Sequence, residues 1–398
     1  MTALSTLSRG RVAVIETRPE TVLADVRRAM ELAGYGEALP LGNGTLLEIG
    51  TSYPTWYPGA GTTPWQLEGT IRELQGAGYE GLVALPKTTS GADPRVAAVN
   101  HKHRHAIEKF GLPSIYLDEP EVERVRYQPT RPFLVLDRLF PEGVTVPKVF
   151  VGRNAVVLPT IKPHDLAAVA GAMMDARGGV LGDRRQRTLA AVDESLVDLL
   201  QIRLDIHAGL FAVMDGTSIA DDTGTFERNL LLASTDLVAI DAVSASLQGF
   251  DPMGLPFVRI AHEKGLGIGE PREIEIVGHD RSLAEWQPIT WDKISEQLVR
   301  FSGGGLLAAA RKRLVASPAT ALTVSASDLY RNAYWYPLVG RKRVIQALDT
   351  DWGRTFVGYG DGNVALPNPA PAVGALAIAG TAAVVGGISA GRHALRKR

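Results

Sequence analysis

Residues 45–85 read TLLEIGTSYPTWYPGAGTTPWQLEGTIRELQGAGYEGLVAL, and they place a strand, a loop, a helix and a second strand in order along the chain. The apolar runs 45–50 and 81–85 have the length of buried strands. Between them, a loop rich in Pro, Gly and aromatic residues ends at Thr63, which can cap the following helix while Pro64 takes its first position. This order predicts parallel strands that are covered by helices.

The same alternation extends to both sides of this stretch. Further strands are predicted at 12–15, 114–117, 148–151, 155–158, 211–215, 230–234 and 273–277, and helices at 21–34, 165–176, 193–206, 238–247 and 256–264. We therefore expect an α/β fold with a mostly parallel sheet flanked by helices, a helical C-terminal extension and a terminal apolar helix.

The composition excludes several classes of site. The 398 residues include 42 Lys and Arg, 43 Asp and Glu, and no Cys. A chain without cysteine has no disulfide, no thiol nucleophile, no Cys-ligated zinc and no Cys-ligated iron–sulfur cluster. A net charge of −1 gives no overall attraction to nucleic acid, which we do not expect as a partner.

Changes in composition along the chain suggest five segments. They are an α/β domain over 1–280, a mixed helical subdomain over 281–360, a Pro-rich linker over 361–371, an apolar helix over 372–391 and a basic tail over 392–398.

The apolar segment 372–391 suggests attachment to a membrane. Its twenty uncharged residues can cross a hydrocarbon core as a helix, and the basic tail follows directly. Small residues recur at every fourth position, which would let two such helices approach closely; a helix in a protein core or an oligomer interface is the alternative. The N-terminus lacks the apolar core of a signal peptide, so we expect a cytoplasmic body that is membrane-associated through this helix.

Four polar residues follow predicted strands and form the candidate catalytic and ligand-binding group. Ligands of open α/β sheets bind beyond the carboxyl ends of the strands, where we expect Lys162, His164, Asp215 and Asp236 to gather. A cation, an imidazole and two carboxylates could bind an anion, hold a divalent metal or transfer protons. Alternatively, Asp215 only forms a turn and Asp236 only caps a helix. Asp241, within a helix, is a further candidate ligand-binding residue of this site. Its carboxylate needs a buried partner, for which Lys162 is the candidate.

Other polar motifs are weaker candidates. Thr88 and Thr89 follow a predicted strand and could contribute hydroxyls to ligand binding. His101 and His105 would share one face of a helix and could bind zinc, but a solvated polar face is the favoured interpretation. The glycines of GLGIGEP (265–271) follow a helix and precede a strand, which favours a helix-ending turn over phosphate binding.

The central block resembles the prokaryotic family catalogued as domain of unknown function 362. The residues that carry the resemblance are Pro159, Lys162, His164, Asp215, Gly216, Asp236, Asp241, Gly265, Leu266 and Gly267. The chain departs from the family pattern at Glu48–Thr51, where Lys-Pro-Asn-Leu is usual, and at Met174 and Asp175, where Lys-Asn is usual. It also lacks the Cys-rich ferredoxin-type insert of many members.

Two functions fit these observations, and whether the protein is an enzyme stays open. The first is an enzyme-like domain that binds a small anionic ligand, with a divalent metal as a further candidate and Asp215 and Asp236 as its weak candidate ligands. The second is a non-catalytic accessory or assembly subunit of a membrane-associated complex, with a homo-oligomer as another partner arrangement. The resemblance alone suggests that such a complex carries out redox chemistry.

Overall fold

The computed structural model describes residues 10–88, 93–164, 167–220, 225–278, 336 and 339–366. Thr89 and the apolar segment 372–391 lie outside these ranges, as does most of the predicted subdomain 281–360.

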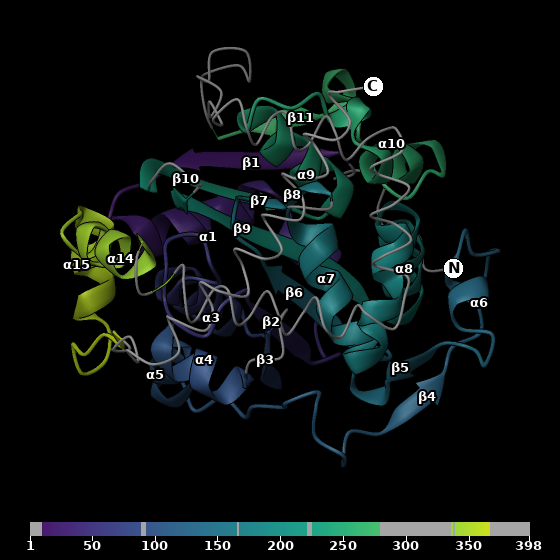
Figure 1. Cartoon of the computed structure of the whole chain (residues 1–398), viewed down its shortest axis with the longest axis horizontal. Helices are drawn as coiled ribbons and strands as arrows, with labels where there is room; N and C mark the ends of the chain where they lie inside the picture. The colour runs from purple at the N-terminus through teal and green to yellow at the C-terminus, as the bar shows by residue number, and fades with distance from the viewer. Residues whose placement is uncertain are drawn as a thin grey trace, which may run out of the picture.

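A seven-stranded sheet forms the centre of the protein, in the order β11-β1-β10-β9-β6-β2-β3 (Figure 1). The strands β9, β6, β2 and β3 run parallel to one another, and β11 runs parallel to β1. Strand β10 alone among these is antiparallel to both of its neighbours. The α/β fold with a mostly parallel sheet is therefore confirmed. The strands span Arg11–Glu16 (β1), Thr45–Thr51 (β2), Leu82–Thr88 (β3), Asn154–Leu158 (β6), Gly209–Ala220 (β9), Thr225–Ser234 (β10) and Glu275–Val277 (β11).

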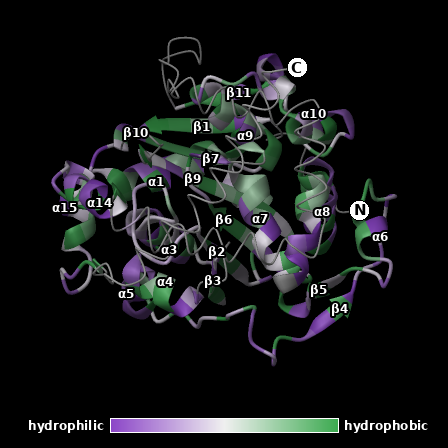
Figure 2. Ribbon diagram, in the orientation of Figure 1, coloured by the Kyte–Doolittle hydropathy of each residue, from purple (hydrophilic) through white to green (hydrophobic). Residues whose placement is uncertain are grey.

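Helices cover both faces of the sheet because successive strand residues point to opposite sides. One face packs against α1 (Val22–Leu32) and α3 (Pro64–Gly76). The other packs against α7 (Ala172–Val180), α8 (Val192–Ile206) and α9 (Leu237–Leu247), whose residues are largely hydrophobic where they meet the strands (Figure 2).

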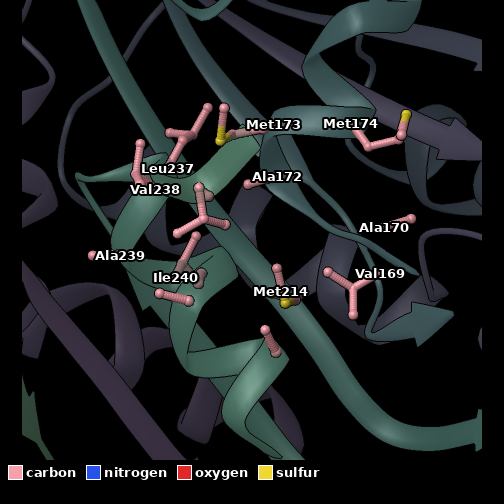
Figure 3. Packing of buried hydrophobic residues seen from close by; sticks show 14 of the residues in the cluster. Val169, Ala170, Ala172, Met173, Met174, Met214, Leu237, Val238, Ala239 and Ile240 are labelled. Carbon is pink, nitrogen blue, oxygen red and sulfur yellow. The ribbon is translucent and has the colours of Figure 1, made fainter. Parts of the chain in front are cut away.

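Helices α7 and α9 meet over strand β9 (Figure 3). Met173 and Met174 of α7, Met214 of β9 and Ile240 of α9 belong to one buried cluster. Unbranched methionines can fill irregular gaps between such elements. This packing fixes the position of α7, and α7 contributes a residue to the candidate site that is described below.

The local signals around the first strand–helix–strand unit are confirmed. Thr63 caps α3 by accepting a hydrogen bond from the Gln66 backbone N–H, and the Gln66 side chain accepts one from the Thr63 N–H. Pro64 occupies the first turn. This capping box starts the helix at the position that the sequence predicts.

Between residues 114 and 176, three expectations about secondary structure were wrong. Residues 148–151 form a 3₁₀ turn, η1 (Lys148–Phe150), and not a strand. Residues 114–117 make only an isolated bridge, Ala84 to Ser114. The helix predicted from 165 begins at Ala172, because β7 (Lys162–His164) and β8 (Ala168–Ala170) pair as a hairpin before it.

The remaining elements lie around this framework. They are α2 (Tyr35–Ala38), α4 (Pro94–Asn100), α5 (His103–Lys109), β4 (Arg124–Arg126), α6 (Leu136–Leu139), β5 (Thr145–Pro147), η2 (Gly182–Ala191), η3 (Pro252–Gly254), α10 (Pro256–Glu263), η4 (Pro271–Glu273), α14 (Arg341–Leu348) and α15 (Asp351–Gly358). Within the described ranges, no helix combines the length and the apolar character that crossing a membrane requires.

The C-terminal helices α14 and α15 pack into the core that α1 and α3 cover. The Trp352 indole N–H donates to Asn229 Oδ1 at 2.7 Å. Phe356 stacks on Trp56, with ring centroids 4.2 Å apart. Residues beyond 340 thus complete the packing around the loop that follows β2.

Candidate functional site

The carboxyl ends of β2, β3 and β6 meet at one edge of the sheet because these strands are parallel. Thr51 of β2 lies in register with Thr88 of β3. Lys87 precedes Thr88, and Lys162 follows the end of β6 within β7. The structure therefore brings Thr88 and Lys162 to the same edge, as the sequence predicts.

Lys162 is a partly buried cation at this edge. Its ammonium donates to Thr160 Oγ1 at 3.1 Å, and the Thr160 hydroxyl donates to the Gly59 carbonyl at 2.7 Å. Among the described residues, no carboxylate lies within 4.0 Å of Lys162 Nζ. Burial lowers the pKa of Lys162; the Asp175 carboxylate opposes this, and the Lys87 ammonium adds to it.

His164 lies on the same strand, two residues beyond Lys162. Its Nδ1 accepts a hydrogen bond from the Ala167 backbone N–H at 3.3 Å. The residue is half-buried. Strand β7 thus carries the predicted cation and the predicted imidazole together.

A buried charge network lies under this edge. Lys87 Nζ contacts Glu48 Oε2 at 2.6 Å, the Asp175 carbonyl at 2.7 Å and Asp175 Oδ2 at 3.4 Å. The other Glu48 oxygen pairs with Arg203 of α8. Burial alone would raise the pKa of Glu48, but the charges of Arg203 and Lys87 outweigh it and lower the pKa to about 2.

The sequence prediction missed this network, although one signal was present. Glu48 is an acidic residue inside the apolar run TLLEIG, and a carboxylate in such a strand requires a cation. Each of the two stretches where the chain departs from the family pattern contributes one carboxylate, Glu48 and Asp175, and both contact Lys87. Close contact also explains Gly50, because a Cβ there would lie 2.1 Å from Asp175 Oδ1.

Asp215 is a structural anchor, and its hydrogen bonds are fully used. Its Oδ2 accepts from the Thr63 hydroxyl at 2.8 Å and the Trp65 indole N–H at 2.7 Å. Its Oδ1 accepts from the Thr217 N–H and hydroxyl at 2.9 and 2.8 Å. The expectation that Asp215 ends a strand was wrong: β9 continues to Ala220 and pairs with β10 there.

Asp236 lies at the opposite edge of the sheet from Lys162, so the expected gathering of four residues was wrong. Its strand, β10, runs antiparallel, and Ser234 at its end pairs with Ala212 near the start of β9. The carboxylate caps α9 through the Val238 and Ala239 N–H groups, both at 3.0 Å. The helix-cap alternative accounts for these contacts.

The Gly-rich turn after α10 packs on the same carboxylate. Asp236 Oδ2 accepts from the Ile268 N–H at 2.9 Å. A Cβ on Gly267 would lie 2.3 Å from Asp236 Oδ1, so only glycine fits there. Gly265, with φ of +67°, ends α10. These contacts match the helix-ending turn that the sequence favours.

Asp241 binds the start of α7 and not Lys162, so the predicted partner was wrong. Its two oxygens accept from the Ala172 and Met173 N–H groups at 2.6 and 3.0 Å. A Cβ on Gly171 would lie 2.1 Å from Asp241 Oδ1. Burial outweighs these hydrogen bonds and raises the pKa of Asp241 to about 7.

His101 and His103 hold the loop after β2, so the expectation of a solvated helix face was wrong for these two residues, whereas His105 on α5 is exposed. His101 and His103 are buried, and their Nε2 atoms bind the Tyr53 and Thr62 carbonyls at 2.8 and 2.5 Å. The helix breaks between α4 and α5 at Lys102, where φ is +61°. Burial lowers the pKa of His101 to about 3 and that of His103 to about 4.

The described residues do not form a shared metal site. No group of three His, Asp or Glu side chains within the described ranges is arranged to hold a metal ion. Asp215 and Asp236 lie at opposite edges, and each oxygen of Asp215 already accepts two hydrogen bonds. We derive no metal chemistry from this pair.

Comparison with known proteins identifies one matching family. The sequence profile described as Domain of unknown function (DUF362) matches residues 48–246, which are 199 of the 398 residues. A crystal structure of a protein from Thermotoga maritima is similar over 55% of this chain, with a TM-score of 0.35 and 11% identity. The chain spans 55% of the length of that protein. No curated protein matches.

Proposed function

Because the chain belongs to the DUF362 family, whose description leaves the activity open, we propose that it binds a small anionic ligand at the carboxyl edge of β2, β3 and β6. Lys162 carries this proposal. It is a partly buried ammonium, and within the described ranges no carboxylate lies close enough to pair with it. A bound anion would supply the missing counter-charge.

The residues around Lys162 favour the binding of a ligand with one anionic group. The charge of Lys87 is already shared with Glu48 and Asp175, so of these two lysines at the described part of the edge, Lys162 is the one whose charge is left for a ligand. His164 from the same strand can add a hydrogen-bond donor. Burial lowers the pKa of Lys162 because it disfavours the charged ammonium. A bound anion would stabilise the charged ammonium and so raise this pKa again.

The experiment is native mass spectrometry of the protein purified in mild detergent from its own host. Wild type is expected to carry a bound small molecule, and Lys162→Gln is expected to lose it while keeping the wild-type thermal unfolding curve. Lys148→Gln is the matched control, because Lys148 is an exposed lysine paired with Glu123. A ligand that stays on Lys162→Gln, or a wild-type protein without ligand, contradicts the proposal.

A non-catalytic accessory subunit is the second candidate, and one observation favours it. Asp215, Asp236 and Asp241 each accept hydrogen bonds at both carboxylate oxygens, so all three have structural roles. A subunit of this kind needs a partner surface and no catalytic carboxylate. The proposal that such a complex carries out redox chemistry applies only to this second candidate function.

We also propose that residues 372–391 tether the protein to a membrane, with its body in the cytoplasm. Deleting residues 372–398 is expected to move the protein from the membrane fraction to the soluble fraction. If partner proteins are lost on affinity purification at the same time, the accessory role is supported; unchanged partners count against it. Retention of the deleted protein in the membrane fraction contradicts the tether.

A further inference from the structure

Two arginines from separate segments of the chain converge on one hydroxyl group. Arg124 of β4 donates through Nε to Thr145 Oγ1 at 3.2 Å, and Arg184 of η2 donates through Nη2 to the same oxygen at 2.5 Å. Thr145 lies on β5, which pairs with β4. The pairing of β4 with β5 and the packing of η2 thus hold two guanidinium groups side by side.

Among the described residues, this pair has one carboxylate within ion-pair distance, that of Glu142, and it lies near the limit of that distance. Arg124 also donates to the carbonyls of Thr145 and Val180, and none of the described carboxylates lies within 4.0 Å of it. Arg184 Nη1 lies 3.9 Å from Glu142 Oε1, and the same oxygen binds Arg187 more closely, at 2.6 Å. The two cations therefore face each other with hydrogen bonds but little counter-charge.

The electrostatic cost of placing two arginines together is reflected in the pKa of Arg124. Burial lowers the pKa of Arg124, and the charge of Arg184 lowers it further. The side chain of Arg184 is 29% exposed, so a small ligand can reach it.

We propose that Arg124 and Arg184 bind a phosphoryl group at Thr145, at a site separate from the edge that carries Lys162. Guanidinium groups match the oxygens of phosphate with paired hydrogen bonds, and a doubly charged anion would offset the repulsion between the two arginines. Thr145 accepts from both arginines, which leaves its hydroxyl hydrogen to donate to an anion oxygen. The ligand would be a small phosphorylated molecule or the phosphate of a lipid headgroup.

The test is isothermal titration of the full chain with inorganic pyrophosphate at low salt. Wild type is expected to bind, and Arg184→Gln to bind at least tenfold more weakly. Arg184→Lys keeps the charge but loses the planar fork, so it should fall between them. Arg104→Gln is the matched control, because Arg104 is an exposed arginine paired with Glu108, and it should bind like wild type.

Further arms separate this proposal from its alternatives. Lys162→Gln is titrated as well, because pyrophosphate is itself a small anion and could bind at Lys162. Binding that Lys162→Gln loses and Arg184→Gln keeps assigns pyrophosphate to the Lys162 site and overturns this proposal. Sedimentation with phosphatidic acid vesicles distinguishes the sources: a loss of binding in Arg184→Gln relative to wild type identifies the headgroup, and equal binding identifies a soluble ligand. Absence of pyrophosphate binding in wild type, or equal binding by wild type and both Arg184 variants, overturns the proposal.

Discussion

Asp241 illustrates how a single residue can connect two helices. Its carboxylate lies within α9, yet it caps the first N–H groups of α7. A negative charge at a helix N-terminus is favourable, but complete burial of that charge is costly. Gly171 provides the space for this contact. Asp241 therefore positions α7, and with it the Asp175 side chain at the proposed ligand site.

This balance predicts a specific dependence of stability on pH. The pKa of Asp241 is about 7 in the folded protein, against an ordinary value of 3.8. A raised pKa contributes stability that is fully present below about pH 4 and is lost as the pH rises through about 7. Asp241→Asn removes this titration and one acceptor, and should cost about 1–3 kcal/mol of stability in acid.

Urea unfolding between pH 4 and pH 8 measures the effect. The stability of wild type relative to Asp241→Asn should fall steadily as the pH rises across that range. Asp137→Asn, at an exposed position, should follow wild type within about 0.5 kcal/mol. A difference between wild type and Asp241→Asn that stays constant with pH would contradict this assignment.

Among the elements, the charge network fixes how α8 and α7 sit on the sheet. Glu48 of β2 pairs with Arg203 of α8 and with Lys87 of β3, and Lys87 reaches Asp175 of α7. Arg203 is fully buried and lies over the Phe150 ring. Such a network adds little net stability compared with an apolar core, but removing one member leaves a buried charge without its partner.

A double-mutant cycle tests this interpretation. Glu48→Gln and Arg203→Met should each cost about 3–5 kcal/mol, because each leaves buried charge uncompensated. The double variant should cost clearly less than the sum of the two, with a coupling of about 1–3 kcal/mol. Since the pKa of Glu48 is lowered to about 2, its contribution is present above its ordinary 4.5 and lost as the pH falls through about 2.

An exposed pair supplies the comparison for this cycle. Glu123→Gln and Lys148→Met break a surface ion pair of 2.9 Å, and their coupling should stay below about 1 kcal/mol. Urea unfolding of all the variants at pH 7 measures both cycles. If the coupling energies of the buried and the exposed pair are equal, or if the costs of Glu48→Gln and Arg203→Met simply add, the buried pair is coupled no more strongly than a surface ion pair, which contradicts this interpretation.

At the scale of the whole molecule, local patterns predict the fold better than the site. The strands at 12–15, 45–50, 155–158 and 230–234 and the cap at Thr63 follow from apolar runs and from residues close in sequence. These signals suffice for an α/β sheet.

The site depends on contacts that no local pattern reports. Asp236 lies at the opposite edge because β10 is reversed, and strand direction is decided by pairing across the sheet. Asp241 finds its partners at Ala172 and Met173, far from it in sequence. The position of Lys162 at the carboxyl edge does follow from local sequence, because Lys162 comes shortly after the end of β6.

The reversed strand β10 also constrains how the chain can be built on the ribosome. Strand β1 is synthesised long before its partners, because Val12 pairs with Ser234 and Ile276, far downstream. Strand pairing of this long range is slow, and an exposed apolar strand is prone to aggregate until its partners arrive. The segment RVAVIE is therefore the one that a chaperone would have to shield while the rest of the protein is translated.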